Sequence, residues 1–145
     1  MRISRRFADK RTYGEKRSTD DIQYIVVQTI SNTASSHYFI RDNEAIQLIP
    51  DEYMSNAING ARIGKDGILH GICTKYNSIS IGVPYEMSDD VKQMCLNLVM
   101  TIKQRYKICN ENIVRKTDVT GESNPEAWYD NDRWTKDIKN KLIEF

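Results

Sequence analysis

The polar segment from Val114 to Pro125, VRKTDVTGESNP, holds the side chains whose types and spacing come nearest to a reactive site. Its order is that of a metal-binding turn: a strand end, then Asp-Val-Thr-Gly, a polar pair and a proline. Lys116 and Asn124 stand where a metal ion would need His and Cys. Zinc is held by imidazole, thiolate or carboxylate groups, whereas lysine is a cation at neutral pH and asparagine offers a weak neutral oxygen. The segment therefore indicates hydrogen bonding and charge pairing rather than metal binding.

The two histidines of the chain, His37 and His70, offer a second possible site. His70 begins the sequence HGIC, three residues before Cys73, and His37 could complete a set of three metal ligands. The alternative is that the GIC segment packs beside a strand. His37 has two interpretations of its own, as a pocket-lining residue or as an ordinary hydrogen-bonded histidine.

Short apolar runs predict the strands that would position these residues. The β-branched run at 22–27 shows little alternation, which is typical of a strand covered on both faces. A hairpin is expected next, with strands at 36–40 and 44–49 around the turn Arg41-Asp42-Asn43 and Pro50 as its end. SISIGV at 78–83 predicts a further buried strand, and 113–115 a short strand that leads into the polar segment.

Two helices are expected in the second half of the chain. Ser88 is a suitable N-cap, with Asp89 and Asp90 in the first turn, and apolar residues follow at helical spacing: Val91, Met94, Cys95, Leu98, Val99 and Ile102. A last helix begins at about Asn131, with apolar residues four apart: Trp134, Ile138 and Leu142. Strands interspersed with helices predict one α/β domain over residues 1–145, with a central mixed β-sheet flanked by helices.

Composition narrows the partners. The 145 residues carry a net charge of +1, so attraction to a nucleic-acid polymer or an anionic membrane is not expected. No run approaches the ~20 apolar residues that cross a bilayer, and the N-terminus lacks the apolar core of a secretory signal, which predicts a cytoplasmic protein with three reduced cysteines. Residues 1–20 are expected to be irregular and basic, a solvated arm rather than an anion-binding tail. Seven of the first 17 residues are basic: Arg2, Arg5, Arg6, Lys10, Arg11, Lys16 and Arg17.

Four segments, in order, resemble the main motifs of the zinc-dependent N-acetylmuramoyl-L-alanine amidases of type 2, the group that includes phage lysins and peptidoglycan-recognition proteins. They are YIVVQTISNT, SSHYFIRDNEAIQLIPDEY, HGICTKYNSISIGV and VRKTDVTGESNP. The resemblance extends from about Arg11 to the final helix and is strongest to lysins from phages and prophages of Gram-positive bacteria. It implies an amidase-like fold.

The residues that such an amidase needs for catalysis are replaced at every position that the resemblance aligns. The two zinc-binding histidines correspond to Gln28 and Lys116, and the zinc-binding cysteine corresponds to Asn124. The lysine that stabilises the transition state corresponds to Glu122, and a frequent glutamate to Gly82. Moving the alignment by a residue or two restores nothing, because the chain has only two histidines. The resemblance thus implies a pseudo-enzyme that needs no zinc or other cofactor.

The resemblance also implies a missing helix. Relatives have a long helix between the first strand and the next, whereas here only Thr29–Ser35 connects them. Without this first family helix, part of the sheet would be uncovered. Exposed apolar surface of that kind usually finds a partner, so we expect a homodimer.

The leading hypothesis is a phage-encoded binding protein in the cytoplasm of the bacterial host cell. It would sequester a small polar or anionic ligand, such as a nucleotide-type host signalling molecule, in the former active-site cleft. The expected ligand-binding residues are Gln28, His37, Arg62, Lys116, Glu122 and Asn124, with Lys116 as the point charge and Lys65 as a further anion contact. Arg62 and Lys65 have ordinary solvated side chains as their alternative, and the aromatic candidates Tyr38, Tyr53 and Trp128 have core packing as theirs.

Three other functions stay open. The cleft would bind a peptidoglycan fragment (a muropeptide) without cutting it, or the protein would be a residual amidase with a non-standard site. No nucleophile with an adjacent base stands in the sequence to support the second of these. The third is an interaction protein that uses the uncovered face of the sheet.

Overall fold

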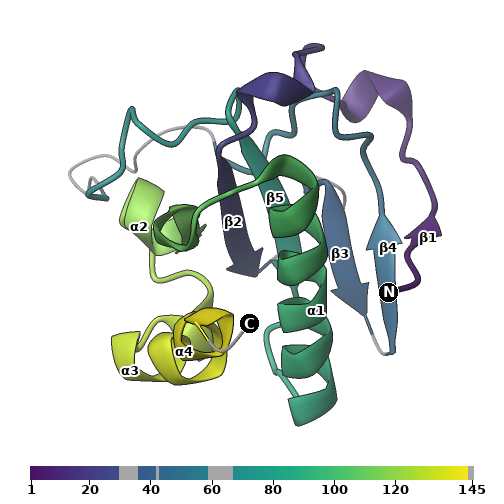
Figure 1. Ribbon diagram of the computed structural model, residues 1–145. Helices are drawn as coiled ribbons and strands as arrows, with labels where there is room; N and C mark the ends of the chain where they lie inside the picture. The colour runs from purple at the N-terminus through teal and green to yellow at the C-terminus, as the bar shows by residue number, and fades with distance from the viewer. Residues whose placement is uncertain (30–35, 42, 59–66, 144–145) are drawn as a thin grey trace.

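The computed structural model describes residues 1–29, 36–41, 43–58 and 67–143, which form one α/β domain around a six-stranded mixed sheet (Figure 1). The strand order is β1-β4-β3-β5-β2-β6. β3, β5, β2 and β6 are parallel to one another, while β4 is antiparallel to β3 and carries β1 parallel to itself. The strands are β1 (Ser4–Arg5), β2 (Tyr24–Thr29), β3 (Tyr38–Arg41), β4 (Glu44–Gln47), β5 (Ser78–Val83) and β6 (Ile113–Arg115). The predicted fold class is confirmed.

The predicted elements form where their patterns placed them, apart from small shifts in their ends. β5 and β6 have the expected bounds, the hairpin joins β3 to β4, and β2 begins two residues later than expected. α1 spans Asp89–Tyr106, and the Ser88 hydroxyl accepts a hydrogen bond from the Val91 N–H at 3.2 Å. The last helix is one continuous segment with a π-helical middle: α3 (Asn131–Trp134), a π turn (Thr135–Lys139) and α4 (Asn140–Ile143). No helix in the described ranges is long and apolar enough to span a membrane.

The two faces of the sheet differ in chemistry. The face covered by α1 is apolar: Ile25 and Val27 of β2 and Ile79 and Ile81 of β5 lie with the buried residues of α1 and the C-terminal helices in one core (Figure 1). Side chains alternate along a strand, so the intervening residues point to the other side, which we call the second face. There β5 presents only Ser78, Ser80 and Gly82, and a smaller apolar cluster covers part of β2 and β6. Along β5, the second face therefore presents small and polar residues where the first face presents apolar ones.

The N-terminal segment is more ordered than predicted. Ser4 and Arg5 pair with Ile46 and Gln47 of β4, so the sheet gains an edge strand, and two short 3₁₀ turns follow at Lys10–Thr12 and Thr19–Asp21. The expectation of a solvated arm is wrong for Arg17, which is only 6% exposed. The other basic residues of the first 17 are exposed, as expected.

The strand register explains how a short segment joins β2 to β3. Parallel strands usually need a crossover of a dozen or more residues, and only residues 30–37 lie between these two. Gln28 lies opposite Gly82 of β5, and Tyr38 lies opposite the preceding residue, Ile81, so β3 begins at the level where β2 is ending. The chain therefore does not return along the length of the sheet. Residues 30–35 lie outside the described ranges, so the uncovered surface and the homodimer stay predictions.

Candidate functional site

The segment after β6, expected to be a loop, begins with the short helix α2 (Lys116–Thr120). The Asp118 carboxylate accepts hydrogen bonds from the Arg115 N–H at 2.9 Å and from the Arg115 guanidinium at 3.0 Å, which closes the first turn. Gly121 ends the helix with a positive φ of 77°, a conformation that glycine adopts without steric cost. The Arg115 guanidinium also donates to the carbonyl oxygens of Trp128 and Tyr129. These bonds hold the start of α2, and with it Lys116, in a fixed position.

Asn124 acts as a clip between this segment and the end of β2. Its side-chain oxygen accepts a hydrogen bond from the Thr29 N–H at 2.7 Å, and its side-chain nitrogen donates to the Thr29 carbonyl at 3.2 Å. The amide thus pairs with the Thr29 main chain as a neighbouring strand would. The Asn124 carbonyl in turn accepts from the Thr117 N–H at 2.8 Å. Asn124 was predicted to bind a ligand, but both polar atoms of its side chain already have partners.

Lys116 and Glu122 lie together at the surface of the same segment. The Lys116 ammonium is 3.9 Å from the Glu122 carboxylate, and the two side chains are 20% and 36% exposed. Val27 pairs with Arg115 in the sheet. Lys116 follows Arg115 as Gln28 follows Val27, so Lys116 lies at the level of Gln28. Their convergence as a ligand site stays a prediction, and the Lys116 charge is already paired with Glu122.

Gln28 is buried, yet its side-chain oxygen is unsatisfied. The residue is 1% exposed, and among the described residues neither its Oε1 nor the Oγ1 of the adjacent Thr29 has a hydrogen-bond partner. Gln28 pairs with Gly82 of β5, which pairs in turn with Phe39 of β3, so these three residues form one row across the second face. Leaving a buried acceptor unpaired typically costs about 1–3 kcal/mol. Such groups are rare in native proteins, and a bound ligand, water or ion is one way to satisfy them.

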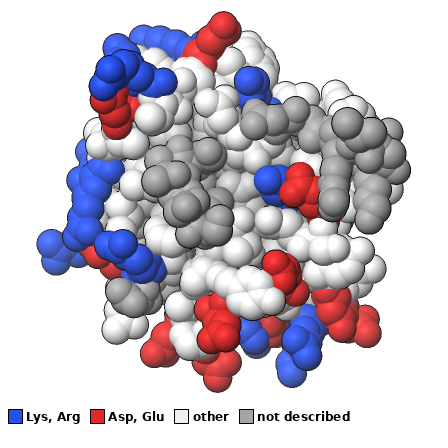
Figure 2. Space-filling view, turned by 180° about the vertical axis from the view of Figure 1, so that it is seen from behind, with Lys and Arg blue, Asp and Glu red and all other residues white. Residues whose placement is uncertain are grey.

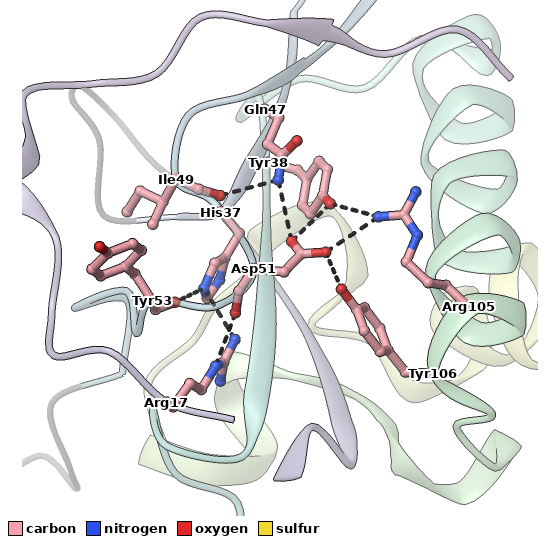
Figure 3. A network of polar contacts seen from close by, with 9 residues as sticks. All are labelled: Arg17, His37, Tyr38, Gln47, Ile49, Asp51, Tyr53, Arg105 and Tyr106. Carbon is pink, nitrogen blue, oxygen red and sulfur yellow. Dashed lines mark hydrogen bonds and ion pairs between the residues drawn. The ribbon is translucent and has the colours of Figure 1, made fainter. Parts of the chain in front are cut away.

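His37 lies in a different place, inside a buried polar network (Figure 3). The Ser80 N–H donates to its Nδ1 at 3.1 Å, so the ring proton is on Nε2, which donates to the Tyr53 carbonyl at 2.7 Å. The Arg17 guanidinium lies 3.2 Å from Nε2. Burial, together with the charge of Arg17, lowers the pKa of His37 to about 4. The ring is neutral, has no exposed surface and is not among the residues that line the three cavities of the described part of the chain, so the prediction that it binds a ligand is corrected to the hydrogen-bonded alternative.

The rest of the network surrounds Asp51 (Figure 3). Its carboxylate accepts hydrogen bonds from the Tyr38 hydroxyl at 2.8 Å, from the Gln47 amide at 3.3 Å, from the Arg105 guanidinium at 3.2 Å, and from the Tyr106 hydroxyl. The Arg17 guanidinium donates hydrogen bonds to four main-chain carbonyl oxygens, those of Asp51, Lys75, Tyr76 and Ser78. Burial beside this carboxylate raises the pKa of Tyr38.

Two of the three aromatic residues expected to stack on a ligand are core residues. Tyr38 and Trp128 have no exposed surface, and the Trp128 indole N–H donates to the Asp137 carboxylate at 2.9 Å. Tyr53 is partly buried and packs against Tyr13 with ring centroids 5.3 Å apart. Core packing, the alternative interpretation, holds for Tyr38 and Trp128.

The open space at the carboxyl ends of β2, β3 and β5 is a groove of about 580 Å³, which we call the edge groove. Sequence analysis missed most of the residues that shape it. Its walls include Thr29 and Asn124, which the clip joins, and also Phe39, Arg41, Tyr85 and Glu126. Arg41 had been assigned to the hairpin turn, but it is the last residue of β3 and points to the same face as Phe39. Ligands of open α/β sheets characteristically bind at such carboxyl ends.

Charge is unevenly spread over the side of the molecule turned away from α1. Figure 2 shows mostly uncharged side chains at the centre of this view, with Lys and Arg gathered along the edge that carries the N-terminal segment. In the same view, Asp and Glu gather along the lower edge (Figure 2).

The alternative metal site at His37, His70 and Cys73 is not formed. His70 and Cys73 line a separate cavity of about 260 Å³, while His37 is held by Ser80 and Tyr53. Burial raises the pKa of the Cys73 thiol to about 12, which disfavours the thiolate that binds metals. Among the described residues, no three His, Cys, Asp or Glu side chains lie close enough to hold a metal ion. Arg62 and Lys65, the remaining predicted anion contacts, lie outside the described residues.

The residues that the resemblance aligns with zinc ligands do not fit a zinc ion. Asn124 uses its amide on the Thr29 main chain, and Lys116 presents a cation. Gln28 alone has an oxygen to offer, and one neutral amide oxygen does not make a zinc site.

Solved structures share this fold. PlyL is 21% identical, with a TM-score of 0.75 over 97% of this chain and 96% of that one. The PlyG catalytic domain is 22% identical, with a TM-score of 0.75 over 99% and 94%. The N-acetylmuramoyl-L-alanine amidase LysC from Clostridium intestinale is 15% identical, with a TM-score of 0.67 over 98% and 99%. No family model matches the sequence, and no curated protein matches it. The chain therefore has an amidase-like α/β fold, and the likeness extends to the fold alone.

Proposed function

We propose that the protein is a catalytically inactive amidase-fold protein that binds a small polar or anionic ligand, such as a nucleotide, at the carboxyl edge of its sheet. The observation that carries the proposal is the Asn124 clip. Two hydrogen bonds to Thr29 occupy the side chain at a position where the family resemblance expects a metal ligand. Asn124 therefore makes a structural contact, Gln28 is neutral, and Lys116 is paired with Glu122. These three residues together do not hold a metal ion that would activate water for hydrolysis.

The same edge retains what a binding protein needs. The groove volume of about 580 Å³ lies within the 300–1,000 Å³ range typical of small-ligand sites. Thr29 lines the groove, and its Oγ1 is a buried polar atom with no partner among the described residues, which a ligand with an N–H or O–H donor would satisfy. Gln28, whose Oε1 is unpartnered in the same way, is the residue next to Thr29 and is not itself part of the groove wall. In this proposal the ligand is held and released intact, which suits a phage-encoded protein that sequesters a signalling molecule in the cytoplasm of its host.

A muropeptide is the second candidate ligand. The observation that favours it is the fold shared with LysC, which is an N-acetylmuramoyl-L-alanine amidase. A groove that once held a substrate can keep its affinity after the catalytic groups are lost, because binding and catalysis use different contacts.

Calorimetry with a panel of mononucleotides and muropeptides, combined with zinc analysis and a muropeptide cleavage assay, tests the proposal. LysC serves as the positive control for cleavage. We expect one member of the panel to bind the purified protein, the ligand to be recovered intact, and no stoichiometric zinc. One zinc ion per chain that is lost on chelation together with stability, or muropeptide cleavage at a rate near that of LysC, would reject an inactive binding protein.

A further inference from the structure

We infer that the edge groove selects a mononucleotide, that is, an aromatic base with a single phosphate-like group, and that Arg41 rather than Lys116 binds the anionic end. This inference rests on the proposed function and names the ligand class and the anion-binding residue of the same site.

The first step concerns the charge of Arg41. Glu44 lies opposite Arg41 across the hairpin, but the Glu44 carboxylate is bound to Arg6 at 2.9 Å. No acidic side chain of the described ranges forms an ion pair with Arg41. Lys116, by contrast, faces Glu122 and is not part of the groove wall. A guanidinium without a competing carboxylate is the better phosphate ligand, because its planar N–H groups match phosphate oxygens.

The second step concerns the aromatic walls. Phe39 and Tyr85 both line the groove, and Tyr85 is 60% exposed. A tyrosine ring with so much exposed surface is stabilised when a planar ring stacks on its face. Phe39 lies beside Gly82 in the sheet, and Gly82 has no side chain to cover the Phe39 ring from that strand. These walls fit a nucleobase.

The third step concerns the carboxylate in the groove wall. Glu126 lines the groove together with Tyr85, and the Glu126 carboxylate raises the pKa of the Tyr85 hydroxyl. Glu126 can accept hydrogen bonds from ribose hydroxyls or from an exocyclic amino group. It also repels additional phosphates. The described walls therefore carry one cation and one carboxylate, which suits a monophosphate better than a triphosphate.

The fourth step concerns rigidity. The Asn124 clip holds Thr29 and the segment that leads to Glu126 in a fixed relation. The ligand would therefore meet walls that are already in place, which reduces the entropy cost of binding.

The experiment is a calorimetric titration of the full chain with adenosine monophosphate, cyclic adenosine monophosphate, ATP, adenosine and ribose 5-phosphate. We expect a monophosphate, linear or cyclic, to bind more tightly than ATP, and more tightly than adenosine or ribose 5-phosphate, which each lack one half of the ligand. Arg41→Ala should weaken binding of the monophosphate by about 10- to 100-fold, the range for loss of a charge-assisted hydrogen bond. Tyr85→Ala should weaken it by about 5- to 100-fold through loss of stacking.

Matched variants separate these contacts from general charge and stability. Lys116→Ala and Arg133→Ala each remove one cation outside the groove walls and should change the affinity by less than about twofold. Tyr85→Phe keeps the stacking face and should retain most of the affinity. All of the substituted side chains are at least partly exposed, so the thermal unfolding midpoint should stay near that of the unchanged protein.

Each other outcome overturns the inference in a recognisable way. If a nucleotide binds but Arg41→Ala leaves its affinity unchanged, or if ATP binds most tightly, the assignment of the groove is wrong while the proposed binding function stands. If only muropeptides bind, the ligand class is wrong and the binding function again stands. If no compound of either panel binds, the inference and the proposed function both fail.

Discussion

The polar groups of this protein fall into two regions that differ in how completely they are satisfied. In the Asp51 network, made of the side chains of Arg17, His37, Tyr38, Gln47, Asp51, Arg105 and Tyr106, the Asp51 carboxylate has four donors and both His37 ring nitrogens have partners (Figure 3). At the carboxyl edge of β2, Gln28 Oε1 and Thr29 Oγ1 are buried without partners.

The difference separates groups that stabilise the fold from groups that are available to a ligand. A satisfied buried network rigidifies a core, and removing one member leaves the polar groups that it bonded buried without a partner, which destabilises the fold. An unsatisfied buried group lowers the stability of the folded chain, so an apolar substitution of similar volume is tolerated in the absence of ligand. The predictions below test this contrast, from the largest expected effect to the smallest.

Asp51→Ala should lower the free energy of unfolding by about 3–5 kcal/mol, because the buried Tyr38 hydroxyl and Gln47 amide lose their acceptor. The ion pair to Arg105 adds little, since that side chain is 44% exposed. Urea denaturation measures the change. Glu44→Ala, which breaks the exposed pair with Arg6, is the matched control and should cost no more than about 1 kcal/mol. Equal losses in the two variants would contradict a stabilising role for the network.

Acidification should destabilise the protein through His37. Its pKa falls from 6.5 to about 4 on folding, so between these pH values the unfolded chain binds more protons than the folded one. Stability is therefore complete above about pH 6.5 and decreases as the pH falls toward 4, by about 3 kcal/mol for this residue. Urea denaturation at several pH values, compared with His37→Gln, measures the difference. The variant should lose this part of the pH dependence, and parallel pH profiles would show that His37 is not the group responsible.

Asn124→Ala should cost about 1–3 kcal/mol, because the Thr29 N–H and C=O lose their partners together. Hydrogen exchange should show faster exchange of the Thr29 amide in the variant, with the amides of α1 unchanged. Asn124→Asp keeps an acceptor for the Thr29 N–H but places a carboxylate against the Thr29 carbonyl. Its free energy of unfolding should therefore lie between that of the unchanged protein and that of Asn124→Ala. Unaltered protection of Thr29 in Asn124→Ala would refute the clip.

Gln28→Met should change stability by less than about 1 kcal/mol and can even stabilise the protein, because it removes an unpartnered buried oxygen at similar volume. Thermal unfolding with and without adenosine monophosphate measures both halves of the prediction. The midpoint without ligand should be nearly unchanged, while the stabilisation by ligand should decrease. A loss of several kcal/mol without ligand would mean that Gln28 serves the fold, as Asp51 does.

Local patterns in the sequence determine much of this fold. Ser88 and the apolar positions that follow it define α1, and SISIGV defines β5, because capping and strand burial depend on neighbouring residues. α2 could also have been predicted, from Asp118 in its first turn and Gly121 directly after it.

The positions of the site residues depend instead on distant partners. Arg17 stands among exposed basic residues in the sequence, but its hydrogen-bond acceptors lie 34 to 61 residues away. The clip joins Asn124 to Thr29 across 95 residues. Arg41 was assigned to the hairpin turn, and its place at the groove depends on Tyr85, Asn124 and Glu126, which are distant from it in the sequence. No local pattern specifies contacts of this kind.

The most direct test of a ligand held at the carboxyl edge is an NMR titration of the ¹⁵N-labelled protein with adenosine monophosphate. We predict that the largest amide shifts occur at Gln28 and Thr29 on β2, at Phe39 to Arg41 on β3, and at Tyr85, with the amides around Asp51 little changed. Shifts centred on the cavity beside His70 and Cys73, or on the Asp51 network, would contradict this assignment of the binding site.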